Sequence, residues 1–266
     1  LPLGPTGYGD SPYSSFSAYA GNPYFIDLAL LRRDGLLLPG EAEAPDWGAD
    51  PRQVDYGRIY ARRLPLLRLA AERGWARDGA AAEAFAEANR GWLPDYALFM
   101  ALKRRFDMRP WTEWPVDIRL RKDGSAERYA RELAEDVRFF TYVQYLFFRQ
   151  WDALRDYLHR KGIRVIGDMP IYVAMDSADV WSDPRSFLLD EKNVPKCVAG
   201  VPPDYFCGDG QLWGNPIYDW EHMRADGYGW WIRRVEGARR LFDVLRIDHF
   251  RGLESFWSVP YGEATA

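Results

Sequence analysis

The longest periodic pattern of apolar positions in the chain runs from Ala126 to Lys161. Within it, apolar side chains recur at intervals of three and four residues, which is the spacing of one face of an α-helix. The positions between them are mostly charged, so the pattern predicts one long helix, and we interpret its aromatic stripe as core. Gly162 follows at the position where a C-capping glycine ends a helix.

After that helix the chain changes to a short apolar run that is typical of a buried strand. Residues 163–167 read Ile-Arg-Val-Ile-Gly and end at Asp168. A helix, a glycine turn, a strand and a terminal carboxylate follow one another in this order in parallel α/β sheets and barrels. Because barrel chemistry lies at the C-terminal ends of strands, Asp168 is a candidate site residue. Its structural alternative is to cap the turn at residues 171–173.

A second run of this kind, Val-Leu-Arg-Ile, occupies residues 244–247. Asp248 leaves this predicted strand at its C-terminal end, and Arg246 lies two positions earlier on the same face. A cation beside a carboxylate favours its ionised form, which a nucleophile that attacks a sugar carbon needs. A helix cap or a structural ion pair accounts for Asp248 equally well on this pattern alone.

The remaining segments are less regular. Residues 29–125 are often interrupted by Pro, Gly and Asp, which indicates an insertion with predicted helices at 57–73, 80–89 and 93–105. Residues 194–220 form a predicted loop rich in Gly, Pro and aromatic residues, and a loop of this length in a compact domain is usually functional. From Trp220 to Leu241 the pattern predicts a helix that leads into the strand at 244–247.

Composition narrows the possible functions. The net charge is −4 over 266 residues, with Lys and Arg scattered, so nucleic-acid binding is not expected. Two cysteines exclude a disulfide scaffold and fit a reducing, cytoplasmic location. The three histidines lie far apart, and Asp176 and Asp179 lack further oxygen ligands, so no metal is expected. No apolar run reaches membrane-spanning length, and the glycines at 4, 7 and 9 lack a phosphate-loop pattern.

Aromatic residues are abundant, with 12 Trp, 16 Tyr and 14 Phe. Large aromatic side chains dominate core burial, but many of these lie in Gly- and Pro-rich loops, where they suit stacking on sugar rings. Four stretches carry a resemblance to the amylomaltases, the 4-α-glucanotransferases or disproportionating enzymes of glycoside hydrolase family 77. These stretches are residues 4–28, 167–173, 200–216 and 246–252.

The resemblance implies an α/β fold, namely part of a TIM (β/α)8 barrel with a mostly helical insertion after the first strands. Residues 1–28 would form the barrel start and a glucan-groove loop, and residues 29–125 the insertion. Residues 126–266 would supply βα units, with an aromatic flap at 194–220 and the nucleophile strand at 244–248. A barrel alone needs about 250 residues before insertions, so we expect the chain to be an internal fragment.

The resemblance also implies a reaction and a cleft. Segments of α-1,4-glucan would pass between maltooligosaccharides by a retaining double displacement, through a covalent glucosyl intermediate on Asp248. Arg246 would keep Asp248 charged, His249 would hydrogen-bond a sugar hydroxyl, and Asp168 would support the same first donor subsite. The general acid/base, a Glu in the family, would lie beyond Ala266, so the fragment itself is expected to be inactive.

Further glucan-binding residues are implied in the N-terminal loop, in the insertion and in the flap. Tyr56 would hold a glucan away from the reaction centre, although ordinary packing explains it equally well. The full set of these positions is Tyr8, Ser11, Tyr13, Tyr56, Tyr205, Phe206, Trp213 and Asn215.

Two alternatives stay open: an α-amylase-type retaining glucan hydrolase, and a catalytically incomplete glucan-binding fragment. A phosphorylase is disfavoured because no basic phosphate pocket or cofactor-lysine pattern is seen. We expect no cofactor, no nucleic-acid partner and no membrane partner. The sequence leaves the oligomeric state open.

Overall fold

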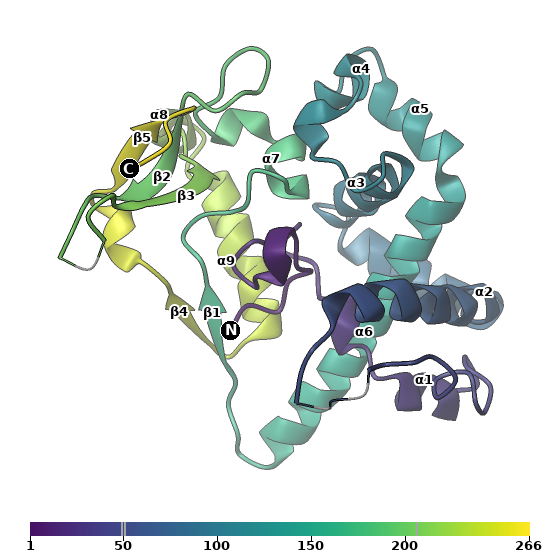
Figure 1. Ribbon diagram of the computed structural model, residues 1–266. Coiled ribbons are helices and arrows are strands. Elements are labelled where there is room, and N and C mark those ends of the chain that lie inside the picture. Colours follow the sequence, from purple (N-terminus) through teal and green to yellow (C-terminus); the bar gives the residue numbers. More distant parts are fainter. Residues whose placement is uncertain (49, 51, 206) are drawn as a thin grey trace.

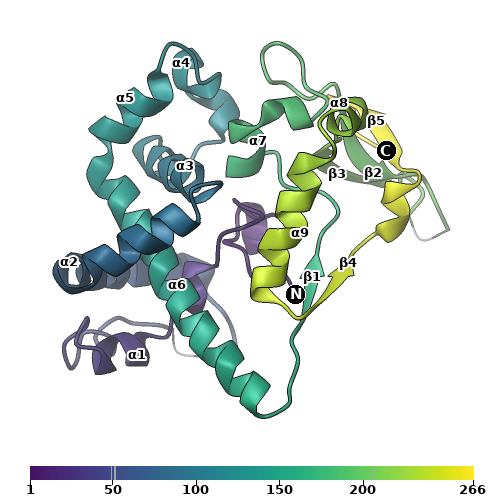
Figure 2. The same ribbon diagram turned by 180° about the vertical axis from the view of Figure 1, so that it is seen from behind.

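The computed structural model describes residues 1–48, 50, 52–205 and 207–266. Figures 1 and 2 show a helical part and a sheet-containing part, with the N-terminal residues between them. The helical part contains α1 (Leu28–Arg33), α2 (Tyr56–Ala88), α3 (Leu93–Arg105), α4 (Val116–Arg119), α5 (Ser125–Glu132) and α6 (Ala134–Arg160). The second part contains β1 (Ile166–Met169), α7 (Ala178–Ser182), β2 (Cys197–Val201), β3 (Gln211–Pro216), α8 (Trp220–Ala225), α9 (Gly229–Leu241), β4 (Val244–Ile247) and β5 (Trp257–Pro260).

The structure contains helices where the sequence predicted them in residues 57–105, but the bounds of two of them differ. The helix predicted at 93–105 is confirmed as α3. The two helices predicted at 57–73 and 80–89 are one continuous helix, α2. The segment between them stays helical because Gly74 lets the ring of Tyr142 on α6 pack closely against it, where a side chain on Gly74 would clash. Tertiary packing therefore overrides the weak helix propensity of glycine here.

The long amphipathic helix predicted at 126–161 is interrupted once. Leu133, with φ −107° and ψ 24°, separates α5 from α6. The longer piece, α6, ends at Arg160, and Gly162 follows with a φ of +72°, which confirms the predicted glycine at the helix end. The apolar stripe of α6 is core as predicted, with Phe140, Val143 and neighbouring side chains buried.

Two clusters of buried side chains form the core. One lies between α2, α3 and α6 and includes Leu67, Phe140 and Leu146. The other joins α3, α7 and α9 and includes large aromatic rings such as Trp181 and Tyr218. Each buried large apolar side chain contributes about 1.5–3 kcal/mol, so the tryptophans and phenylalanines of these clusters stabilise the fold.

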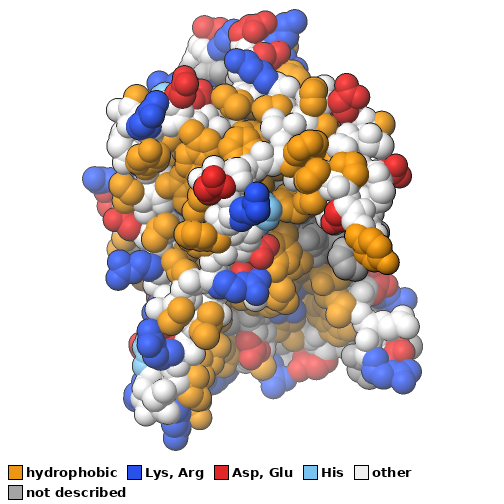
Figure 3. All heavy atoms as spheres, turned by 90° about the vertical axis from the view of Figure 1, so that its left-hand side faces the viewer, with side chains coloured by type: hydrophobic (Ala, Val, Ile, Leu, Met, Phe, Trp, Pro, Cys, Tyr) orange, Lys and Arg blue, Asp and Glu red, His pale blue; other side chains and the backbone are white. Residues whose placement is uncertain are grey.

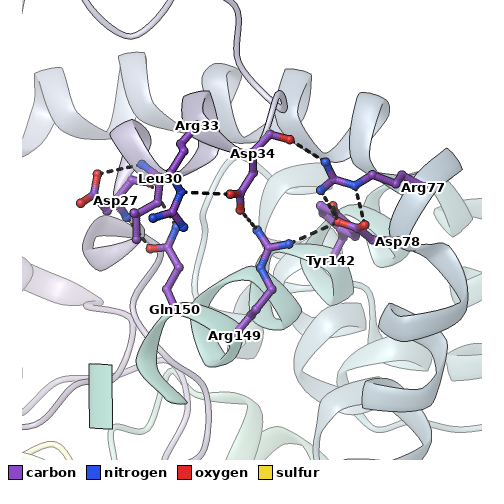
Figure 4. A network of polar contacts seen from close by, with 9 residues as sticks. All are labelled: Asp27, Leu30, Arg33, Asp34, Arg77, Asp78, Tyr142, Arg149 and Gln150. Carbon is purple, nitrogen blue, oxygen red and sulfur yellow. Dashed lines mark hydrogen bonds and ion pairs between the residues drawn. The ribbon is translucent and has the colours of Figure 1, made fainter. Parts of the chain in front are cut away.

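A network of polar contacts fixes the helical part at the end of α1 (Figure 4). Arg149 of α6 bonds through Nη2 to Asp34 Oδ2 at 2.8 Å, and through Nη1 to Asp78 Oδ2 of α2 at 3.4 Å. The hydroxyl of Tyr142 donates to the same Asp78 oxygen at 3.0 Å, and Arg77 also pairs with Asp78. One cation thus connects three helices.

The sheet predictions hold for two parallel strands. β1 pairs with β4 in parallel register, so that Asp168 lies beside Arg246. The strand predicted at 163–167 is displaced to Ile166–Met169, so Asp168 lies inside the strand and not after it. Within the described residues the parallel sheet contains β1 and β4 alone. The partial barrel, and with it the division at residues 28 and 125, therefore stays a prediction.

The segment predicted as an aromatic loop is more regular than expected. Residues 194–220 contain β2 and β3, which pair antiparallel, and β5 pairs with the other edge of β2. This ladder satisfies the backbone polar groups that a plain loop would leave to water. The helix predicted from Trp220 to Leu241 is also divided, because Gly227 and Tyr228 adopt positive φ angles of 76° and 61° between α8 and α9.

Candidate active site

Asp168 on β1 is the most constrained carboxylate of the candidate site. Arg246 donates from Nε to Oδ1 and from Nη2 to Oδ2 of Asp168, both at 2.8 Å. The Tyr13 hydroxyl donates to Oδ2 at 2.8 Å. Burial of Asp168 opposes its ionisation, but the hydrogen bonds from Arg246 and Tyr13 outweigh burial and lower the pKa of the carboxyl. Asp168 is therefore a carboxylate held in one orientation by three bonds.

Asp248 lies directly after β4 and close to this group. Its backbone N–H donates to the carbonyl of Met169 at 3.0 Å, so the two strands stay in register to their ends. Its side chain is 47% exposed, and Arg246 Nη2 is 3.5 Å from Oδ1. Asp248 is thus accessible and held by one long contact, whereas Asp168 is held firmly.

His249 has an unusual backbone conformation next to Asp248. Its φ of 52° and ψ of 43° lie in the left-handed region, which non-glycine residues rarely adopt. A Cβ atom on Gly252 would lie 2.8 Å from His249 Cδ2 and 2.8 Å from Ile171 Cδ1. Glycine at this position therefore lets the turn after β4 fold tightly onto the segment after β1. Strain of this kind often accompanies functional sites.

The flap contributes an aromatic side chain to this turn. The ring centroid of Trp213 on β3 lies 5.1 Å from that of His249, edge to face at 80°. Trp213 also contacts Tyr172 at 6.4 Å and stays 38% exposed. The amide nitrogen of Asn215 donates to the carbonyl of Val173 at 2.8 Å, so Asn215 supports the main chain after β1.

The other predicted residues are distributed unevenly. Ser11 Oγ accepts from the Tyr13 backbone N–H at 3.2 Å, so it shapes the turn that carries Tyr13. Tyr205 is 97% exposed at the tip of the flap. The side chain of Tyr8 and the whole of Phe206 lie outside the described residues.

Tyr56 is not brought to Asp168. It begins α2, is 41% exposed and lines a separate cavity of about 630 Å³ with Tyr24, Tyr60 and other side chains. The rings of Tyr24 and Tyr56 are 6.4 Å apart. A much smaller cavity of about 60 Å³ adjoins Asp168 and is lined by Tyr13, Tyr172 and Arg234 among others.

Sequence reasoning missed Tyr172 and Arg234 as residues around the site. Arg234 lies on α9 with the regular spacing of a helical residue, and its charge gave no hint that it is buried. Tyr172 belongs to the stretch 167–173 but was not singled out. Their positions follow from tertiary packing between α9 and the segment after β1.

The surrounding face is rich in exposed apolar side chains. Figure 3 shows this side of the molecule, where hydrophobic side chains cover a wide area around a few charged side chains and a histidine. The turn after β4 and the strands β3 and β5 supply several of them: Leu212, Trp213, Phe250, Phe256, Trp257 and Tyr261.

The described ranges contain no cluster of three or more His, Cys, Asp or Glu side chains that could hold a metal ion. Among the helices in those ranges, none is long and apolar enough to cross a membrane.

The parallel strands β1 and β4, with Asp168 and Asp248 near their C-terminal ends, define an α/β protein with a candidate site at that edge of the sheet. A family model described as 4-alpha-glucanotransferase, glycoside hydrolase family 77, matches residues 1–266. The chain belongs to this family, which confirms the resemblance seen in the sequence.

Individual relatives agree with this assignment. The chain is 49% identical over 267 residues to a 4-alpha-glucanotransferase of Clostridium butyricum, covering 100% of the chain and 55% of the relative. It is 50% identical over 270 residues to that of Thermus thermophilus, covering 100% and 53%. A solved amylomaltase from Streptococcus agalactiae in complex with acarbose superposes with a TM-score of 0.96 at 40% identity, covering 100% of the chain and 54% of that structure. The chain spans about half the length of the curated relatives it matches.

Proposed function

We propose that the protein carrying this chain is a 4-α-glucanotransferase that transfers α-1,4-glucan segments between maltooligosaccharides. The observation that carries the proposal is the contact of Arg246 with both Asp168 and Asp248 at the C-terminal ends of two paired parallel strands. The relatives named 4-alpha-glucanotransferase and the acarbose complex of a similar structure support it. A cytoplasmic location stays a prediction.

In the proposed reaction Asp248 is the nucleophile. One oxygen of its carboxylate bonds to the anomeric carbon of the donor sugar as the glycosidic C–O bond breaks, and the leaving oxygen takes a proton from the general acid. The 4-hydroxyl of a second glucan then attacks the same carbon, its proton returns to that acid/base, and Asp248 is released. We propose that the acid/base is a Glu outside residues 1–266.

The geometry of the two aspartates suits different roles. Asp248 is exposed enough to meet a sugar, and a single contact at 3.5 Å leaves its carboxylate room to move. Asp168, which is 8% exposed and fixed by three bonds, suits a supporting role in the first donor subsite. Arg246 contacts both carboxylates, and its hydrogen bonds to Asp168 help to lower the pKa of that carboxyl.

The proposed glucan contacts surround this centre. Trp213 offers an exposed indole beside His249, whose ring would reach a sugar hydroxyl. The flap would exclude water and so favour transfer over hydrolysis. The remaining proposed contacts in the flap and the N-terminal loop are Tyr205, Phe206, Asn215, Tyr8, Ser11 and Tyr13.

The cavity beside Tyr56 supports the proposed holding site for a glucan away from the reaction centre. Its aromatic lining and volume of about 630 Å³ suit several sugar rings. If Tyr56 instead serves only packing, Tyr56→Ala leaves maltooligosaccharide binding unchanged.

The test is an incubation with maltotriose alone, using the natural protein with any sequence that flanks residues 1–266. Glucose together with a ladder of longer maltooligosaccharides means transfer, and we expect this ladder to disappear in Asp248→Asn. Asp156→Asn, an exposed carboxylate on α6, is the matched control and should keep the ladder.

Each other outcome points to a different function. Shorter sugars without a ladder would indicate the glucan hydrolase. Acarbose binding without any turnover would indicate a glucan-binding protein. A ladder that survives in Asp248→Asn would show that Asp248 is not the nucleophile.

A further inference from the structure

The segment that follows Asp168 has its carbonyl groups fixed by one buried cation. Arg234 of α9 donates from Nη1 to the carbonyl of Ile171 at 2.7 Å and from Nη2 to that of Tyr172 at 3.4 Å. Nη2 also bonds to the carbonyl of Pro170. Three successive carbonyls therefore converge on one guanidinium group.

Neighbouring side chains complete this set of bonds. The hydroxyl of Tyr218 donates to the carbonyl of Ile171 at 2.7 Å and accepts from Arg234 Nη1 at 2.9 Å. Asn215 donates to the carbonyl of Val173, the next residue along. Every carbonyl from residue 170 to residue 173 thus accepts a side-chain hydrogen bond. We call this segment, residues 170–173, the clamped loop.

The surroundings of Arg234 show that this arrangement is costly. The side chain is 3% exposed, and its guanidinium lies 5.3 Å and 5.1 Å from the ring centroids of Trp230 and Trp231. Burying a cation is unfavourable unless its donors are satisfied. Within the part of the chain that the structure describes, no carboxylate forms an ion pair with Arg234. Its Nη1 and Nη2 atoms donate to carbonyl and phenol oxygens, and its buried Nε has no partner there. Such a residue fixes main-chain geometry.

The clamped loop contacts the candidate site at two points. It begins directly after Met169, whose carbonyl accepts the backbone N–H of Asp248 at 3.0 Å. Its Ile171 side chain packs where Gly252 brings the His249 ring close. A shift of the loop would therefore move Asp248 and His249 relative to Asp168.

We infer that Arg234 is a positioning residue that sets the relative placement of Asp168, Asp248 and His249 through the clamped loop. The inference rests on the proposed function for its kinetic test. Misplacing reacting groups by about 1 Å can cost about 100-fold in rate. A residue that acts only on stability would lower the folded fraction without changing the rate per folded molecule.

The kinetic test compares Arg234→Met with Arg234→Lys in maltotriose disproportionation. We expect kcat per folded molecule to fall about 10- to 100-fold in Arg234→Met. Lysine keeps a positive charge that can reach the carbonyls, but it lacks the planar guanidinium group that bonds to several of them at once. Arg234→Lys should therefore recover part of the rate. When Asp168→Asn is already present, Arg234→Met should reduce kcat by a smaller factor than it does in the wild-type protein. The reason is that both changes disturb the same arrangement of Asp168, Asp248 and His249.

The matched control is Arg155→Met. Arg155 is another largely buried arginine that bonds to a carbonyl, that of Arg240, and to Asp243 at the opposite end of β4. We expect Arg155→Met to lower stability and leave kcat per folded molecule unchanged. If it reduces kcat as much as Arg234→Met does, or if the loss persists in full beside Asp168→Asn, the inference is wrong.

A second measurement does not depend on catalysis. Hydrogen exchange of the Asp248 amide reports its bond to the Met169 carbonyl, and it should accelerate in Arg234→Met more than in Arg155→Met. If the wild-type protein gives no ladder, the proposed function fails and this comparison alone decides the role of Arg234. Equal exchange in the two variants overturns the inference. Should Arg234→Met not fold, Tyr218→Phe removes one bond to Ile171 with the charge intact and should accelerate the same amide.

Discussion

Tyr13→Phe tests the Asp168 group with the smallest possible change. The ring stays in place, and only the hydroxyl that donates to Asp168 Oδ2 at 2.8 Å is removed. Asp168 keeps its two bonds from Arg246. Any change in activity therefore reports the third bond to this carboxylate.

The size of the effect follows from the kind of bond and its exposure. A hydrogen bond to a charged group contributes about 1.5–3 kcal/mol when it is buried. Tyr13 is 36% exposed, so water can partly replace the lost hydroxyl. A loss of about 1–1.5 kcal/mol is then expected, which is about 5- to 12-fold in kcat/KM if Asp168 supports the first donor subsite.

The variant should also change the pH dependence. Loss of the Tyr13 donor raises the pKa of Asp168 toward its ordinary value, so the acid limb of the rate profile should move to higher pH. Because the folded pKa lies below the unfolded one, this carboxylate stabilises the fold above the unfolded pKa, and the effect is lost as pH falls through the folded pKa. The stability difference between wild type and Tyr13→Phe should therefore shrink in acid.

The assay is glucose release from maltotriose across pH, together with urea unfolding. Tyr157→Phe serves as the control, because this tyrosine lies on α6 and is 51% exposed. The reasoning is refuted if Tyr13→Phe matches the control in kcat/KM and leaves the acid limb in place.

Three further changes test the fold and its electrostatics. Asp179 is buried, which raises its pKa from 3.8 to about 6. The free energy of unfolding should therefore fall as pH rises from 4 to 6, and urea titrations should show that this pH dependence is absent in Asp179→Asn. Gly167→Ala places a methyl group against the ring of Phe242 and should cost about 1–3 kcal/mol in the same titrations. Arg149→Met removes a half-buried bridge between two carboxylates and should cost about 1–2 kcal/mol, with a smaller loss in high salt.

The elements with strong local patterns could be predicted from the sequence. The stripe of α6 follows from the spacing of apolar residues, the short strand at 244–247 from its apolar run, and the end of α6 from Gly162. The break at Leu133 and the continuity of α2 through Gly74 could not, because neither has a local signal. Both depend on what packs against the helix, and Gly74 is decided by a ring that comes from α6.

The flap shows a different limit. Its Gly, Pro and aromatic composition predicted a loop, yet β2 and β3 form a ladder there. Hydrogen bonds between strands satisfy the backbone whatever the composition, and the partner β5 lies far along the chain. The amino-acid composition of residues 194–220 cannot indicate that a strand at residues 257–260 pairs with β2.

The candidate site shows a pairing that sequence reasoning predicted only in part. Spacing along one strand placed Arg246 beside Asp248, and a contact at 3.5 Å exists. The parallel register of β1 and β4 gives Arg246 a closer partner in Asp168, with two bonds at 2.8 Å. Long-range register is a tertiary property, so the stronger bond could not be seen from either strand alone.

This pairing changes how the candidate nucleophile is controlled. A carboxylate held by two charge-assisted bonds loses mobility and nucleophilicity, because its lone pairs are engaged. Arg246 makes that bidentate contact with Asp168 and leaves Asp248 under its charge but only loosely bound. The arginine therefore lies beside Asp248 without engaging it in a bidentate contact, which leaves the carboxylate of the proposed nucleophile able to move. On this argument Asp168→Asn should weaken the bonds that hold Arg246 and let Arg246 move toward Asp248. The Asp248 carboxylate would then be engaged by the arginine, so kcat should fall although the proposed nucleophile itself is unchanged.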